Sequence, residues 1–334
     1  MKTPIAGLHH VTAIASDPQR NLDFYTQLLG LRFVKRTINF DDPGTYHFYF
    51  GDDTGKPGTI LTFFPWPGAR KGQMGAGEVI ATAFSIPVGS IEFWLDRLKA
   101  NGVDVQEHTR FGSHVISFSD PDGMVLELVE QEEAHPGTAP RYSDVEGSKA
   151  IQGFYGVTLL ERSLENIEEL LSIMGLGKIA EEDNAQKGRL VRFAPEGDAL
   201  GRFVDIKLDA EVRPGRMGAG TVHHIAFRNT DDAAQAEWRR TLARYLPVTP
   251  VQDRTYFHSI YFREPGGVLF EMATDNPGFL IDEPVESLGE ELRIPEWFEP
   301  NRRAIEARVL PITLHKAAFA KEETANAQVA GVSR

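Results

Sequence analysis

Two stretches of the chain carry nearly the same pattern: Phe118 to Glu130 reads FSDPDGMVLELVE, and Phe262 to Thr274 reads FREPGGVLFEMAT. Both follow Phe-x-acid-Pro-x-Gly-x-x-x-Glu, which places Glu127 and Glu271 at equivalent positions. Acid-Pro-x-Gly is a turn signal, and the runs on either side are typical of β-strands, so each stretch is predicted to form a β-hairpin. Because internal similarity of this kind marks a repeated structural unit, the search extends outward from these two hairpins.

The strand that should open each unit also repeats. Four short β-like runs share it: GLHHVTAI (7–14), VIATAFSIP (79–87), GFYGVTLL (153–160) and TVHHIAFRN (221–229). Each is followed by an amphipathic helix pattern, near residues 21–30, 91–101, 164–175 and 231–245. Alignment makes four first-strand positions equivalent, namely His10, Ala81, Gly156 and His224, and four fourth-strand positions, namely Thr62, Glu127, Asp205 and Glu271. We therefore predict an α+β fold of four βαβββ modules, forming two domains of paired modules with open curved β-sheets.

The domain organisation follows from this repeat. Modules 1 and 2 are assigned to an N-terminal domain, residues 1–135, and modules 3 and 4 to a C-terminal domain, residues 150–275, separated by a polar, Pro/Gly-containing segment. Residues 276–315 are expected to form a C-terminal extension that packs on the domains. Residues 316–334, which are small and polar, are expected to form a mobile tail.

Composition narrows the function. The 334 residues include no cysteine, so a disulfide, a thiolate metal site and a Cys nucleophile are all excluded. The formal net charge, 35 − 48 = −13, disfavours nucleic acid and an anionic membrane surface as partners. With no targeting segment and no apolar run of bilayer length, we expect a cytoplasmic protein.

Candidate metal ligands lie on the opening strands. Side chains alternate faces along a strand, so His10 and His224 should point away from their neighbours His9 and His223. The His9 face carries bulky aliphatics and should pack on helices. The opposite face carries smaller or polar residues, as a concave pocket needs. His10 and His224 are therefore the predicted pocket residues.

A carboxylate completes the set. Glu271 lies in the otherwise apolar run GVLFEMA, where an unpaired charge is costly, so it should be paired or bound to a cation. Two histidines and one carboxylate form a facial triad, which leaves positions open for O2 and a chelating substrate and suits Fe(II). The equivalent position in module 1 is Thr62, so one corner of the site lacks a strong ligand. The matching site of modules 2 and 3 has no His and is expected to hold no catalytic metal, with Glu127 paired to an arginine.

These motifs resemble the vicinal oxygen chelate superfamily, which includes glyoxalases, bleomycin resistance proteins and extradiol dioxygenases. The chain is most similar to the ring-cleaving dioxygenases of hydroquinones, through the His-His strands, FVKRT (33–37), the run RTYFHSIYFREPGGVLFE and text near 288–312. The extradiol signature places a His several residues before its Tyr, whereas His258 here precedes Tyr261 by only three.

The resemblance implies Fe(II) bound by His10, His224 and Glu271. It also implies a pocket around the metal. Its catalytic residues would be Tyr261, His223 and His9, and its substrate-binding residues would be Arg254 and Thr12. Tyr261 and Glu271 have matching parity about the hairpin turn, so they should share a face. For His9 and His223 the resemblance and the strand alternation disagree. A surface salt bridge for Arg254 and simple strand packing for Tyr261 are the alternatives.

The function implied is a non-haem Fe(II)-dependent ring-cleaving dioxygenase that opens an aromatic diol, of hydroquinone or catechol type, with O2. Mn(II) shares this ligand set. Two alternatives stay open: a redox-neutral metal lyase or isomerase of the glyoxalase kind, and a metal-free sequestration protein that confers resistance. The sequence does not fix the ring substituents or the general base, and a homo-oligomer is one expectation for the assembly.

Overall fold

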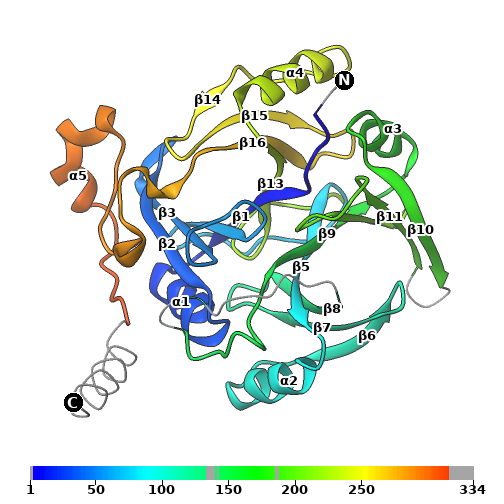
Figure 1. Ribbon diagram of the computed structural model, residues 1–334, viewed down its shortest axis with the longest axis horizontal. Helices are drawn as coiled ribbons and strands as arrows, with labels where there is room; N and C mark the ends of the chain where they lie inside the picture. Colours follow the sequence, from blue (N-terminus) through cyan, green and yellow to red (C-terminus); the bar gives the residue numbers. More distant parts are fainter. Residues whose placement is uncertain (1–2, 133–139, 141–142, 185–187, 316–334) are drawn as a thin grey trace, which may run out of the picture.

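The computed structural model describes residues 3–132, 140, 143–184 and 188–315. It consists of two eight-stranded sheets with a few short helices around them (Figure 1). The strands of the first two modules are β1 (Leu8–Ala15), β2 (Arg32–Asn39), β3 (Asp42–Gly51), β4 (Ile60–Pro65), β5 (Glu78–Pro87), β6 (Gln106–Arg110), β7 (Ser113–Ser119) and β8 (Val125–Gln131). Those of the last two are β9 (Gly153–Glu161), β10 (Gly177–Asn184), β11 (Gly188–Ala194), β12 (Phe203–Leu208), β13 (Val222–Asn229), β14 (Gln252–Asp253), β15 (Phe257–Arg263) and β16 (Leu269–Pro277).

One helix follows the first strand of each module, so the predicted βαβββ order is confirmed. The four are α1 (Pro18–Asp23), which continues into a π-helical turn η1 (Phe24–Leu28), α2 (Ile91–Ala100), α3 (Glu165–Ile173) and α4 (Asp232–Leu242). Two begin with an aspartate cap: Asp17 accepts from the backbone N–H of Arg20, and Asp231 from that of Ala234. No helix in the described part of the chain is long and apolar enough to cross a membrane.

The two sheets combine modules from opposite halves of the chain. The first and last modules share one sheet, in the order β14-β15-β16-β13-β1-β4-β3-β2. The middle modules share the other, in the order β10-β11-β12-β9-β5-β8-β7-β6. In each, antiparallel first strands meet at the centre, β1 with β13 and β5 with β9. The linear division at 1–135 and 150–275 stays a prediction.

Strand register confirms the alignment of the four modules. In every module the fourth strand runs parallel to the first, and the same offset relates the two. The partners are Thr12 with Thr62, Ala83 with Glu127, Thr158 with Asp205 and Ala226 with Glu271. The same four fourth-strand positions therefore lie at the same depth of each half-sheet.

The acid-Pro-x-Gly turns work as the sequence predicts. Glu264 accepts hydrogen bonds from the backbone N–H groups of Gly266 and Val268, and Asp120 accepts from those of Asp122 and Met124. Gly267, with φ 119°, adopts a conformation that a side chain would strain. The turns connect β7 to β8 and β15 to β16 and thereby fix which residues face each other across each hairpin.

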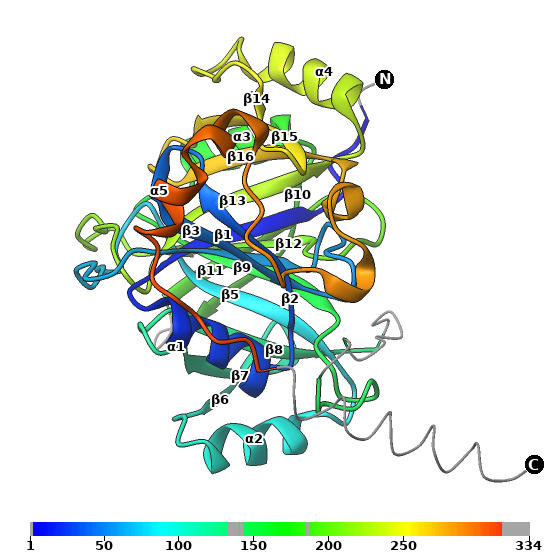
Figure 2. The ribbon, with the colours of Figure 1, turned by 90° about the vertical axis from the view of Figure 1, so that its left-hand side faces the viewer.

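The helices cover the outer faces of the sheets. Val11 and Ile225 are completely buried in one core with residues of the helices, such as Trp94, Leu170 and Trp238. In both ribbon views α2 and α4 lie at opposite ends of the molecule, with the sheets between them (Figure 2). The inner faces are thus left for polar sites.

After β16 the chain returns to the first module as three 3-10 turns, η2 (Phe279–Ile281), η3 (Val285–Ser287) and η4 (Glu296–Asn301), and the short helix α5 (Arg302–Glu306). The fully buried Lys35 donates to Asp282 at 2.7 Å and also contacts Glu283. The Phe279 ring packs on those of Tyr49 and Tyr256. The tail predicted for 316–334 lies outside the described residues.

Candidate metal centre

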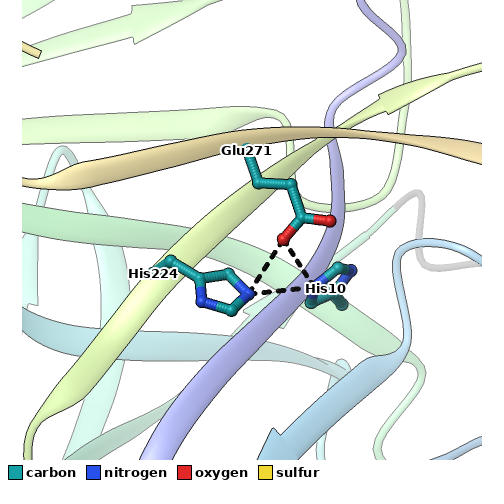
Figure 3. A group of neighbouring side chains, drawn as sticks. All are labelled: His10, His224 and Glu271. Carbon is teal, nitrogen blue, oxygen red and sulfur yellow. Dashed lines mark hydrogen bonds and ion pairs between the residues drawn. The ribbon is translucent and has the colours of Figure 1, made fainter. Parts of the chain in front are cut away.

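Three side chains from three strands converge on one point in the sheet of modules 1 and 4. His10 comes from β1, His224 from β13 and Glu271 from β16 (Figure 3). The Nε2 atoms of the histidines are 3.3 Å apart, and Glu271 Oε2 lies 3.3 Å from His10 Nε2 and 2.9 Å from His224 Nε2. All three side chains are buried, with Glu271 fully inaccessible. The structure thus brings together the three predicted metal ligands.

The donor set fits a cation. Glu271 Oε2 is buried and makes no hydrogen bond to the described residues, while Oε1 accepts one from Ser259. Burial alone would raise the pKa of Glu271, but the adjacent histidines hold that pKa well below its usual range. Burial also lowers the pKa of His224, which favours the neutral imidazole that binds a metal. The two imidazole nitrogens and the carboxylate oxygen are all electron-pair donors that face one another, and a cation between them would satisfy all three. These residues could therefore hold a metal ion.

The prediction that His9 and His223 point toward the helices is wrong, and a β-bulge is the reason. Between β1 and β13 the register skips His9 on one strand and His223 on the other, so each is an extra residue in its strand. His9 Nδ1 lies 2.9 Å from His10 Nδ1, and His223 Nδ1 lies 2.7 Å from His224 Nδ1. Both rings therefore lie beside the candidate ligands.

The same bulge occurs in the other sheet. The pairing of β5 with β9 skips Ile80 and Tyr155, which are the repeat equivalents of His9 and His223. The bulge is thus a property of the module, and the chemistry depends on which residue occupies it. The sequence feature that marks the bulge is the pair of adjacent histidines, which occurs in both β1 and β13. In a regular strand only one histidine of each pair would face the pocket.

The two bulge histidines differ in their surroundings. His9 is buried, and its Nε2 lies 3.1 Å from the carbonyl oxygen of Thr274, to which it donates when Nδ1 accepts from His10. His223 is half-buried and packs edge-on against Phe64. Burial, followed by the neighbouring ligand histidine, places the pKa of His9 well below its usual range and lowers that of His223 to about 3. Both rings are therefore neutral at pH 7.

Tyr261 and Arg254 lie on the same side of the site. Tyr261 is the register partner of Glu271 across the β15–β16 hairpin, and its ring is 5.8 Å from that of His224. Arg254 Nε donates to the Tyr261 hydroxyl at 3.2 Å, and its Nη2 donates to Asp41 at 3.2 Å. Burial and Glu271 raise the pKa of Tyr261, so its hydroxyl keeps its proton. The salt bridge expected as the alternative for Arg254 is present, alongside its bond to Tyr261.

The corner without a strong ligand holds a hydroxyl pair. Thr12 is the register partner of both His224 and Thr62, and the two threonine hydroxyl oxygens are 2.7 Å apart. His47 Nε2 lies 2.9 Å from Thr62 Oγ1, and its Nδ1 lies 2.9 Å from the Tyr49 hydroxyl. Sequence reasoning missed His47. The signal was available, because His47-x-Tyr49 on the third strand of module 1 matches Ser259-x-Tyr261 on that of module 4.

The equivalent site of modules 2 and 3 is occupied by buried ion pairs. Arg110 donates to both oxygens of Glu127, at 3.0 and 2.6 Å, as the sequence led us to expect of that carboxylate. Arg192 donates to both oxygens of Asp205, at 2.7 and 2.8 Å, and to the Tyr155 hydroxyl at 2.8 Å. Each carboxylate is thus neutralised by a guanidinium.

Comparison with known proteins assigns the chain to a superfamily. Residues 7–128 match the family model described as the Glyoxalase/Bleomycin resistance protein/Dioxygenase superfamily. The chain is 48% identical over 312 residues, 93% of its length and 97% of the relative's, to a Bacillus subtilis protein named "Putative ring-cleaving dioxygenase MhqO". The chain therefore belongs to this superfamily.

Two further comparisons refine the picture. The chain is 35% identical to the Chlorohydroquinone/hydroquinone 1,2-dioxygenase of Sphingobium indicum, over 88% of this chain and 93% of that protein. A crystal structure titled "putative dioxygenase from Bacillus subtilis" matches with a TM-score of 0.89 and 48% identity, covering 94% of this chain and 99% of that one. Together they confirm the predicted fold class of paired modules with curved sheets.

Proposed function

We propose that the chain is a non-haem Fe(II)-dependent dioxygenase that cleaves the ring of an aromatic diol, of hydroquinone type in the first instance. The observation that carries the proposal is the convergence of His10, His224 and Glu271 with a threonine at the fourth repeat-equivalent corner. Three strong ligands leave positions free for two further ligands at once. The relatives named ring-cleaving dioxygenases, one of them for hydroquinones, support the substrate class.

Bound Fe(II) would supply open positions for O2 and a deprotonated phenol and a path for electrons from the diol to O2. The chain's own residues would orient the diol. Arg254 is permanently charged and would hold an anionic oxygen, while the protonated Tyr261 hydroxyl would donate a hydrogen bond to an oxygen of the substrate. Thr12 would donate from the opposite side.

The bulge histidines would keep the ligands in the correct tautomer. For His10 and His224 to present Nε2 lone pairs, their Nδ1 atoms must carry the protons, and the Nδ1 atoms of His9 and His223 accept them. His9 is then held in place by the Thr274 carbonyl. His223, half-buried and neutral, would then carry its proton on Nε2 and act in turnover as a hydrogen-bond donor from that atom.

An O2-uptake panel tests the proposal. Protein loaded anaerobically with Fe(II) is mixed with hydroquinones and catechols, and O2 consumption is compared for wild type, His224→Ala and the matched control His114→Ala. His114 is an exposed residue near the start of strand β7, where it contacts Glu107. We expect uptake by wild type and His114→Ala, and none by His224→Ala. Full activity of a Zn- or Ni-loaded protein without O2 uptake would favour a glyoxalase-type lyase instead.

A further inference from the structure

The structure places a second pair of interacting side chains opposite Ser259 and Glu271. In module 4, Ser259 on β15 donates to Glu271 on β16. In module 1 the repeat-equivalent residues are His47 on β3 and Thr62 on β4, which are also hydrogen-bonded. In module 4 the smaller residue, Ser259, is on the third strand and the larger, Glu271, on the fourth. In module 1 the larger residue, His47, is on the third strand and the smaller, Thr62, on the fourth. The module that lacks the carboxylate therefore has an imidazole on the neighbouring strand, hydrogen-bonded to the threonine that stands in the place of the carboxylate.

This imidazole is the middle of a chain of four polar groups. The chain runs from the Tyr49 hydroxyl to His47 Nδ1 (2.9 Å), from His47 Nε2 to Thr62 Oγ1 (2.9 Å), and from Thr62 to Thr12 Oγ1 (2.7 Å). Thr12, Thr62 and Tyr49 are at most 1% exposed. Thr12 ends the chain, and it lies opposite His224 in the strand register. The chain thus leads from the aromatic cluster under Phe279 to the edge of the metal site.

The protons of the chain can be assigned. Burial, followed by the neighbouring His10 and His224, holds the pKa of His47 well below its usual value, so the ring is neutral and has one donor and one acceptor. Burial raises the pKa of Tyr49 well above its usual value, so its hydroxyl keeps its proton. Among the described residues, the only hydrogen-bond partner of that hydroxyl is His47 Nδ1.

One direction therefore satisfies every group. Tyr49 donates to Nδ1, Nε2–H donates to Thr62, and Thr62 donates to Thr12. The hydroxyl hydrogen of Thr12 is then left for a group in the site. If Thr12 donated to Thr62 instead, the fully buried Thr62 hydroxyl would accept twice and its own hydrogen would have no partner among the described residues. If the whole chain were reversed, the buried Tyr49 hydrogen would have none, and either arrangement is costly.

We propose that His47 is a positioning residue for substrate: through Thr62 it turns the Thr12 hydroxyl into a hydrogen-bond donor aimed at an anionic phenolic oxygen of the diol. The inference rests on the proposed function and adds a determinant of affinity to it. A hydrogen bond to an ionised oxygen is about twice as strong as a neutral one, so loss of the preset direction should weaken binding about 10- to 100-fold.

Anaerobic titration of hydroquinone into metal-loaded protein tests this, because it needs no turnover. The variants are His47→Phe, which cannot take part in the chain, Thr62→Val, which is nearly isosteric and keeps His47, and Thr12→Val. Metal content and thermal stability of each are measured beside the dissociation constant. His114→Phe, at an exposed position near the start of β7, is the matched control.

We expect unchanged metal content, an affinity about 10- to 100-fold lower for His47→Phe and Thr62→Val, and partial recovery in His47→Gln, whose amide can donate to Thr62. The double variant Thr12→Val/His47→Phe should bind no more weakly than Thr12→Val alone, because both changes act on one hydrogen bond. In steady state the loss should appear in KM more than in kcat.

Wild-type affinity in a folded His47→Phe, or an effect that adds in full to that of Thr12→Val, would overturn the inference while leaving the proposed function intact. A wild-type protein that neither binds a diol nor consumes O2 with one would instead overturn the proposed function, and the role of His47 with it.

Discussion

His10 Nε2 and His224 Nε2 are 3.3 Å apart although 214 residues separate them in the chain. The pairing of β1 with β13 at the centre of one sheet produces this contact, so the first and last modules must fold together before the site exists. The candidate metal centre therefore exists only when β1 and β13 are paired in this sheet order.

A carboxylate at position 62 should turn the three-ligand site into a four-ligand site. The double substitution His47→Ser/Thr62→Glu copies the Ser259–Glu271 pair of module 4 into module 1. It should create a fourth ligand, hold Zn(II) at least about tenfold more tightly, and abolish O2 uptake because an open position is lost. Competition with a chelator measures the affinity. The Ser259→Ala variant serves as the comparison, since it perturbs the existing carboxylate without adding a ligand. Unchanged metal affinity and full O2 uptake would show that module 1 does not reach the metal.

The ion pairs of the other sheet should affect stability and not activity. Glu127→Gln removes one of the two carboxylates beside the buried Arg110, whose Nε still lies 3.3 Å from Asp205 Oδ2, and should lower the free energy of unfolding by about 1.5–3 kcal/mol. The double substitution Arg110→Met/Glu127→Leu should recover most of this. Denaturant unfolding of metal-loaded protein gives both numbers. A large loss of metal from Glu127→Gln, with its stability unchanged, would contradict the structural role.

Glu161 should make stability fall as pH rises. Burial, followed by the nearby Glu264, raises the pKa of Glu161 to about 8, and its Oε1 makes no hydrogen bond within the described chain. Because the folded pKa exceeds the unfolded value of about 4.5, the folded state binds more protons than the unfolded state between pH 4.5 and 8. The stability that this group contributes is complete below pH 4.5 and lost by pH 8.

The variant Glu161→Gln should remove this pH dependence. Between pH 5 and pH 9 wild type should lose about 3 kcal/mol more of its free energy of unfolding than Glu161→Gln does. Chemical unfolding of both proteins at the two pH values measures this difference. Glu165→Gln, an exposed change at the start of α3, is the control. If wild type and Glu161→Gln lose the same stability over this range, Glu161 is not protonated in the folded protein.

The sequence was sufficient to predict the repeat, because four aligned strands and two acid-Pro-x-Gly turns have strong local signals. It was also sufficient to predict that His10, His224 and Glu271 lie together, since a carboxylate inside an apolar strand needs a partner and the repeat aligns it with the two histidine strands. It failed for His9 and His223, because strict alternation holds only in a regular strand and the bulge that breaks it comes from pairing with a distant strand. His47 was missed for a related reason: its importance depends on Thr62, fifteen residues later on another strand.

Isotope labelling tests the central claim most directly. Protein loaded anaerobically with Fe(II) reacts with hydroquinone under 18O2, the mixture is quenched promptly, and the product is weighed by mass spectrometry. The account predicts a ring-opened product that carries both labelled oxygen atoms, one O2 consumed per diol, and no product from His224→Ala. Turnover without labelled oxygen in the product, or turnover that persists in metal-free protein, would contradict it.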